Sequence, residues 1–134
     1  MKSVLLIEDN YDIRELYRMA FEEARWEVRE SSDGLLGITE LVDNPPTVVL
    51  LDLMMPEMNG YEFMQALKTN TSINIPVIVV SNLAQEEDKA RALSAGAIGY
   101  LVKSDYDGPD LVKAVEELLE KHAAKDTDAA PAPA

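Results

Sequence analysis

The stretch that most constrains the fold is TVVLLDLMMPEMNG, residues 47–60. Its run VVLL, residues 48–51, is apolar throughout, as in a strand that is buried on both faces of a parallel sheet. Asp52 ends the run, and Pro56 and Gly60 in the following segment indicate a loop. Because open α/β sheets bind ligands at the carboxyl ends of their strands, we expect function at the edge that Asp52 occupies.

Strand and helix patterns alternate along the rest of the chain. Apolar segments predict further strands at residues 3–7, 26–31, 76–81 and 98–103. Periodicity and capping residues predict helices after Asn10, from Ser32 or Asp33 to about Val42, at about 60–69, at about 85–95 with Gly96 as its C-terminal cap, and from Pro109 onward. This alternation predicts a three-layer α/β/α sandwich around a five-stranded parallel sheet with right-handed crossovers.

Length and composition predict one domain. A chain of 134 residues, 47% of them hydrophobic, can bury a single core. We expect this domain at residues 1–121, and the Ala- and Pro-rich residues 122–134 as a disordered tail, either a native end or the start of a linker.

Charge and the lack of targeting signals restrict location and partners. The chain has no cysteine, no signal-peptide pattern and no apolar run near the roughly 20 residues of a membrane span, so we expect a soluble cytoplasmic protein. The net charge of −13 argues against direct binding to nucleic acid or to an anionic membrane.

Four of the five predicted strands end in a side chain that can take part in chemistry. Glu8 and Asp9 follow the strand at residues 3–7, and Asp52 follows the strand at residues 48–51. Ser81 and Lys103 are the last residues of the strands at 76–81 and 98–103. A single acid after a strand is most often a helix cap or a turn residue. In a parallel sheet, however, these strand ends lie at one edge, so the joint pattern indicates a shared site.

The predicted site combines three carboxylates, a hydroxyl and an ammonium group. Carboxylates in one cleft repel one another, so they either take up protons or share a cation. Oxygen ligands, few in number and with room for water, favour Mg²⁺ over Ca²⁺. Ser81 and Lys103 beside such a cation would hold a phosphoryl group while a carboxylate attacks phosphorus. The residues themselves therefore indicate Mg²⁺-dependent phosphorylation of an aspartate.

Several motifs, in this order, resemble the receiver domains of two-component response regulators, of which the chemotaxis response regulator is the single-domain example. The motifs are LLIEDN, LLDLMMPEMNGYEF, VIVVSN and AGAIGYLVKS, and the resemblance covers about residues 2–121. It implies a flavodoxin-like, doubly wound sheet in the strand order 2-1-3-4-5. It also implies a phosphoprotein that acts in phosphorelay signal transduction.

The resemblance assigns the metal and acceptor roles. Asp52 would be the phosphoacceptor, and its phosphate would come from a sensor histidine kinase or a phosphotransfer protein. Asp9 and Asp52 would bind Mg²⁺ by their side chains, Glu8 through water, and Met54 by its backbone carbonyl.

The resemblance also implies a switch. Ser81 and Lys103 would contact the phosphoryl oxygens, and Tyr100 would turn inward as Ser81 moves. This would change the surface formed by the fourth helix, the fifth strand and the fifth helix, where a downstream protein would bind. No output domain follows Lys121 in this sequence, so the chain as given would signal through protein contact.

Four positions depart from the family pattern. Ser104 replaces a proline that usually follows the lysine in a cis peptide, and we expect a trans peptide here because a cis bond before Ser costs about 2.5 to 4 kcal/mol. Asn82 replaces a small residue beside the phosphate, where it could narrow access or add a hydrogen bond. Met54 and Leu83 flank the path of the hydrolytic water and cannot orient it, so we expect slow loss of phosphate.

The same residues argue against two other functions and leave two open. A phosphatase or phosphotransferase of the haloacid dehalogenase type needs a second acid two residues after Asp52, where this chain has Met54. A flavin-binding protein would need a neutral phosphate loop in place of Glu8 and Asp9. A phosphorylation-independent scaffold and a receiver fragment of a longer regulator stay open. In either case, the chain would not be an enzyme beyond its own phosphorylation and dephosphorylation.

Overall fold

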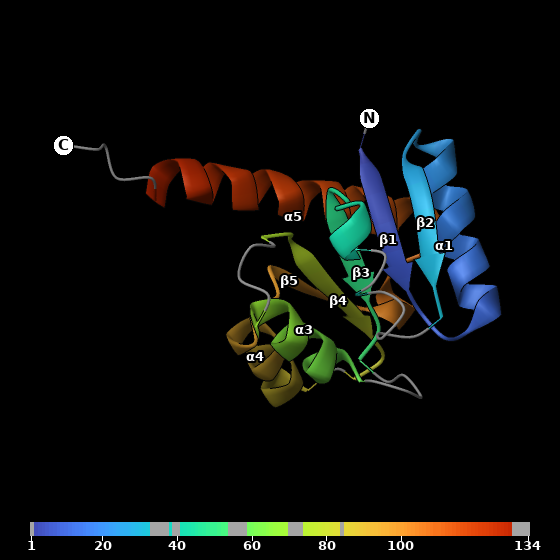
Figure 1. The fold of residues 1–134 in the computed structure, drawn as a ribbon. Helices are drawn as coiled ribbons and strands as arrows, with labels where there is room; N and C mark the ends of the chain where they lie inside the picture. The colour runs from blue at the N-terminus through green and yellow to red at the C-terminus, as the bar shows by residue number, and fades with distance from the viewer. Residues whose placement is uncertain are drawn as a thin grey trace.

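The computed structural model describes residues 2–32, 38, 41–53, 59–69, 74–83 and 85–129. Its centre is one parallel sheet in the order β2-β1-β3-β4-β5 (Figure 1). The strands are β1 (Ser3–Ile7), β2 (Glu27–Ser31), β3 (Val48–Leu51), β4 (Val77–Ser81) and β5 (Gly99–Val102). The predicted fold class and strand order are therefore confirmed.

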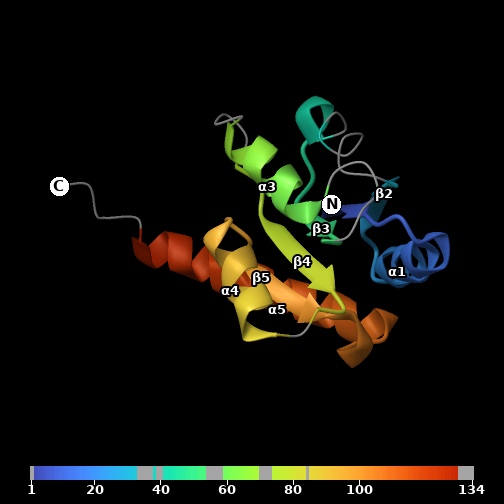
Figure 2. The ribbon, with the colours of Figure 1, turned by 90° about the horizontal axis from the view of Figure 1, so that it is seen from below.

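Helices cover both faces of this sheet. They are α1 (Tyr11–Glu23), α3 (Gly60–Thr69), α4 (Glu86–Ser94) and α5 (Gly108–Ala129), with a short 3-10 helix η1 (Lys103–Asp105) after β5. Helices α1 and α5 contact each other on one face, and α3 lies on the opposite side of the sheet from α1 (Figure 2). This arrangement makes the three layers.

Two apolar clusters, one on each face, explain the unbroken hydrophobic strands. In β1, Val4 and Leu6 belong to the cluster under α1 and α5, whereas Leu5 and Ile7 belong to the cluster under α3. Successive side chains of a strand point to opposite faces, so a strand with helices on both faces must be apolar at every position. All four of these side chains are at most 1% exposed.

The ends of α1 and α4 follow their predicted caps. The side-chain oxygen of Asn10 accepts a hydrogen bond from the backbone N–H of Ile13 at 3.0 Å, which satisfies a free donor of the first turn of α1. Gly96 follows α4 with a φ of 115°, a conformation that favours glycine. Most of the helix predicted between Ser32 and Val42 lies outside the described residues, although residues 41–43 are helical.

Helix α5 is longer than the sequence indicated. It runs through the predicted domain boundary at Lys121 and ends at Ala129. The alanines after His122 favour a helix, and the first proline that can stop it is Pro131. The division into a domain and a tail stays a prediction. Within the described segments, no helix is long and apolar enough to cross a membrane.

The start of α3 packs against the end of β3 with no room for a side chain. A Cβ atom on Gly60 would lie 2.8 Å from Leu53 Cδ2, 2.9 Å from Leu53 Cα and 3.1 Å from the Asp52 carbonyl oxygen. The backbone N–H of Gly60 donates to the Leu53 carbonyl at 2.8 Å. Glycine therefore permits the close return of the chain after Asp52.

We expect Gly60→Ala to lower the free energy of unfolding by about 1 to 3 kcal/mol, because the added methyl group meets backbone atoms that cannot move aside. Gly99→Ala is the comparison, since the three atoms nearest to its Cβ all belong to the Leu118 side chain, which can shift more readily than backbone. Urea denaturation of both variants measures the difference, and equal losses would contradict a backbone clash at Gly60.

Candidate functional site

The parallel register brings the predicted side chains to one edge of the sheet. Ile7 pairs with Leu51 at the ends of β1 and β3, and the backbone N–H of Asp52 donates to the Ile7 carbonyl at 3.0 Å. Ser81 pairs with Val102 at the ends of β4 and β5. The residues that end these strands therefore start from adjacent backbone positions.

Three acidic side chains meet at this edge. One carboxylate oxygen from each of Glu8, Asp9 and Asp52 lies within 4.8 Å of the others. Glu8 and Asp52 are only 4% and 7% exposed, whereas Asp9 is exposed. A set of hard oxygen donors with one member open to solvent fits a divalent cation such as Mg²⁺. Met54, the fourth predicted ligand, lies outside the described residues.

Lys103 contacts two of these acids directly. Its Nζ donates to both carboxylate oxygens of Glu8, at 2.9 and 3.1 Å, and lies 3.4 Å from Asp52 Oδ2. The described chain has no cis peptide bond, so the peptide between Lys103 and Ser104 is trans, as predicted. The bidentate contact with Glu8 was not predicted, because sequence spacing does not set how far a lysine reaches across a sheet.

The electrostatics of the site are dominated by two buried acids beside one lysine. Burial first, and then the hydrogen bond and the charge of the neighbouring Asp52, raise the pKa of Glu8 to about 7 in total. Lys103 acts in the opposite direction through its hydrogen bond and its charge. Tyr17 lies under the same site, where burial first and then Glu8 and Asp52 raise its pKa to about 12.

The two predicted switch residues both bind the backbone of one residue, Leu83. The hydroxyl oxygen of Ser81 accepts a hydrogen bond from the backbone N–H of Leu83 at 3.2 Å. The hydroxyl of Tyr100 donates to the carbonyl oxygen of Leu83 at 2.6 Å. Ser81 is buried and Tyr100 is half-buried. A change at Ser81 can therefore reach Tyr100 through the backbone at Leu83.

Sequence reasoning missed Arg14 and the role of Tyr17. Arg14 Nη1 donates to the backbone carbonyl of Glu8 at 2.6 Å. Tyr17 lies on the apolar face of α1, and the structure places it in the wall of a small cavity that Glu8 and Asp52 also line. Helical periodicity identifies a buried face, but it does not show that this face ends beneath a polar site.

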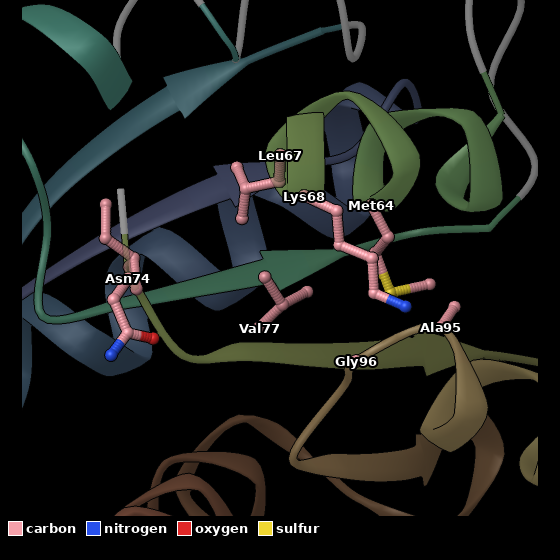
Figure 3. A pocket seen from close by; sticks show the side chains of 8 residues that line it. Met64, Leu67, Lys68, Asn74, Val77, Ala95 and Gly96 are labelled. Atoms are coloured by element: carbon pink, nitrogen blue, oxygen red, sulfur yellow. The ribbon is translucent and has the colours of Figure 1, made fainter. Parts of the chain in front are cut away.

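A pocket of about 140 Å³ lies at the other end of β4. Figure 3 shows Met64, Leu67 and Lys68 of α3 across from Ala95 and Gly96, which follow α4. Val77, the first residue of β4, lines the same pocket (Figure 3), whereas Ser81 ends that strand at the acidic edge. None of the predicted site residues lines this pocket, so it is separate from the acidic site.

Comparisons with known proteins agree with this geometry. The model of the response regulator receiver domain family matches residues 4–116. The KDP operon transcriptional regulatory protein KdpE of Escherichia coli is 36% identical, with 92% of this chain and 54% of KdpE covered. The phosphate regulon transcriptional regulatory protein PhoB of Pseudomonas aeruginosa is 30% identical, with 96% of this chain and 56% of PhoB covered. The chemotaxis protein CheY4 of Vibrio cholerae is 26% identical, with a TM-score of 0.81 over 88% of this chain and 98% of CheY4.

The chain therefore belongs to the family of response regulator receiver domains. It spans about half the length of the curated relatives that it matches. Receiver domains are typically signalling domains rather than enzymes.

The raised pKa of Glu8 predicts how stability depends on pH without divalent cations. Between about pH 4.5 and 7 the folded protein keeps a proton on Glu8 that the unfolded chain has lost, so stability decreases as pH rises through this range. We expect this contribution to be roughly 2 to 3 kcal/mol and to be absent in Glu8→Gln.

Chemical denaturation in the presence of a chelator, at several pH values, measures this effect as the difference between wild type and Glu8→Gln. Glu120→Gln, at an exposed position of α5, is the control and should follow the wild type. A difference between wild type and Glu8→Gln that is constant from pH 4.5 to 7 would show that Glu8 has its ordinary pKa.

Proposed function

We propose that this receiver domain is phosphorylated on Asp52 in a Mg²⁺-dependent reaction and that phosphorylation changes its binding surface. The observation that carries the proposal is the convergence of Glu8, Asp9 and Asp52 with the Nζ of Lys103. Glu8 and Asp52 are buried, so placing their charged carboxylates together costs free energy through desolvation and repulsion. A bound cation would offset this cost.

Each residue has a distinct task in the proposed transfer. A carboxylate oxygen of Asp52 attacks the phosphorus of a donor phosphohistidine, and the bond from phosphorus to the histidine nitrogen breaks as the new bond to oxygen forms. Asp9 and Asp52 by their side chains, Glu8 through water and Met54 by its backbone carbonyl would hold Mg²⁺, which would supply positive charge to the phosphoryl oxygens. Lys103 lies 3.4 Å from Asp52 and is near enough to pair with a phosphoryl oxygen on it.

The proposed output begins at Ser81. A phosphoryl group adds about −1.5 to −2 charges and strong acceptors, so it favours a state in which the Ser81 hydroxyl donates to it. Since that hydroxyl oxygen now accepts from Leu83, and Leu83 accepts from Tyr100, the rearrangement would release or redirect Tyr100. Helix α4 buries one residue, Ala92, so few packing contacts oppose a movement of this helix.

The proposed partners follow from the family. A sensor histidine kinase or a phosphotransfer protein would supply phosphate in the cytoplasm, and a downstream protein would bind the surface of α4, β5 and α5 near Tyr100. KdpE and PhoB are named as transcriptional regulatory proteins and are about twice as long as this chain. The receiver of a longer regulator is therefore the second candidate, and phosphorylation of Asp52 would control its output in the same way.

We expect acetyl phosphate to add one phosphoryl group to the wild type in the presence of Mg²⁺, because acetyl phosphate can replace the phosphohistidine donor. Intact-mass spectrometry measures the product. The adduct should be absent from Asp52→Asn and from samples with a chelator, and it should form normally on Asp110→Asn, an exposed position of α5. A Mg²⁺-independent adduct, or one that persists in Asp52→Asn, would overturn the proposal, and a downstream partner that binds Asp52→Asn equally well would favour the scaffold alternative.

We expect the phosphorylated protein to lose its phosphate slowly, over minutes or longer, because Leu83 has no polar side-chain atom to orient water. Leu83→Gln should shorten the half-life at least several-fold, since an amide can hold the attacking water. Leu83 is 40% exposed, and Leu93→Gln is a matched control because Leu93 is 50% exposed on α4. The time course of the mass adduct gives the half-life, and a wild-type half-life of seconds would refute the expectation.

A further inference from the structure

Arg14 connects α1 to the acidic site through the backbone. Its side chain is only 14% exposed, and its Nη1 donates to the carbonyl oxygen of Glu8 at 2.6 Å. Its Nε lies 3.8 Å from Glu30 Oε2, at the end of β2. One guanidinium group therefore contacts the turn that carries two acids and the strand beside that turn, through separate nitrogens of a rigid planar group.

The turn from β1 into α1 is held at both ends by hydrogen bonds. At its start, the N–H of Glu8 donates to the Ser31 carbonyl at 3.1 Å, and Arg14 binds the Glu8 carbonyl. At its end, Asn10 caps α1, and its carbonyl accepts from the backbone N–H of Arg14 at 3.0 Å. Asp9 lies between these points and is exposed. Its position depends on the peptide groups that flank it.

We propose that Arg14 is a positioning residue for the cation site: by holding the Glu8 carbonyl, it orients the carboxylates of Glu8 and Asp9 toward Asp52. This rests on the proposed function, in which these acids bind Mg²⁺. Arg14 acts through the backbone, because its hydrogen bond goes to the carbonyl of Glu8 and not to the carboxylate. Without this hydrogen bond, the peptide between Glu8 and Asp9 can rotate. The carboxylate oxygens of Glu8, Asp9 and Asp52 then no longer lie close enough together to bind one cation.

Arg18 provides a matched control one turn further along α1. It pairs with Glu15, Glu22 and Glu30, and its Nε lies 3.2 Å from Glu30 Oε1. It thus shares the Glu30 contact and the α1 surface with Arg14, but its ion pairs do not include Glu8. Substituting either arginine removes a positive charge from α1 and a contact with Glu30 of β2. Of the two, it is Arg14 that also binds the Glu8 carbonyl, so the comparison isolates that hydrogen bond.

The experiment is a Mg²⁺ titration followed by amide shifts in ¹H–¹⁵N NMR spectra. We compare wild type, Arg14→Met, Arg14→Lys and Arg18→Met, with thermal unfolding of each variant as a check on folding. We expect Arg14→Met to weaken Mg²⁺ binding about tenfold, as is typical when a group that orients a metal ligand is lost. Arg14→Lys should recover part of the affinity, since it keeps one charged donor, and Arg18→Met should stay within twofold of the wild type.

A second readout needs no metal. The Asp9 amide nitrogen is bonded to the Glu8 carbonyl carbon, so loss of the Arg14 hydrogen bond should shift the Asp9 ¹⁵N signal in metal-free Arg14→Met and leave it in place in Arg18→Met. If Arg14→Met does not fold, the Mg²⁺ affinity and the metal-free Asp9 ¹⁵N shift of Arg14→Lys test the positioning role instead.

Failure of this inference is distinguishable from failure of the proposed function. Wild-type affinity in Arg14→Met, or an equal loss in Arg18→Met, would overturn the positioning role while Mg²⁺ still binds the wild type. If the wild type itself shows no saturable Mg²⁺ binding, the proposed function fails and the role of Arg14 fails with it.

Discussion

The site depends on holding two buried carboxylates next to each other. Glu8 and Asp52 leave adjacent parallel strands, and both are almost fully removed from solvent. Burial and mutual repulsion each disfavour the charged forms of such a pair, which is why the pKa of Glu8 is raised. The Nζ of Lys103 contacts both acids and offsets part of this cost. One positive charge against two or three negative ones leaves the site attractive to a divalent cation.

This arrangement requires a rigid sheet. The backbone pairing of Ile7 with Leu51 places the two acids side by side, and a shift of one residue would turn one of them to the other face. Register is set by the apolar clusters on both faces, in which alternate residues of each strand are fixed by the helices above and below. Core packing therefore determines the geometry of the polar edge, and the close return of the chain at Gly60 lies just beyond it.

Hydrogen bonds to backbone groups connect the site to its surroundings on both sides. Arg14 binds the carbonyl of Glu8 on one side, and on the other Ser81 binds the N–H and Tyr100 the carbonyl of Leu83. Backbone contacts of this kind transmit a change in position without requiring a side chain to reach across the site. They would suit the proposed function, in which phosphorylation of Asp52 changes a surface near Tyr100.

The sequence by itself determined the alternation of strands and helices, the caps at Asn10 and Gly96, and the set of polar residues that end the strands. These features are local, since periodicity, chain reversal and capping depend on residues within a few positions of one another. The tertiary structure alone decided that Lys103 binds Glu8 in addition to Asp52, that Arg14 holds the Glu8 carbonyl, and that α5 continues to Ala129. The two contacts depend on the distance and direction between side chains brought together by the sheet, which no spacing along the chain records. The alanines after His122 favour a helix, but an Ala- and Pro-rich end does not by itself fix where the helix stops, and the structure places that end at Ala129.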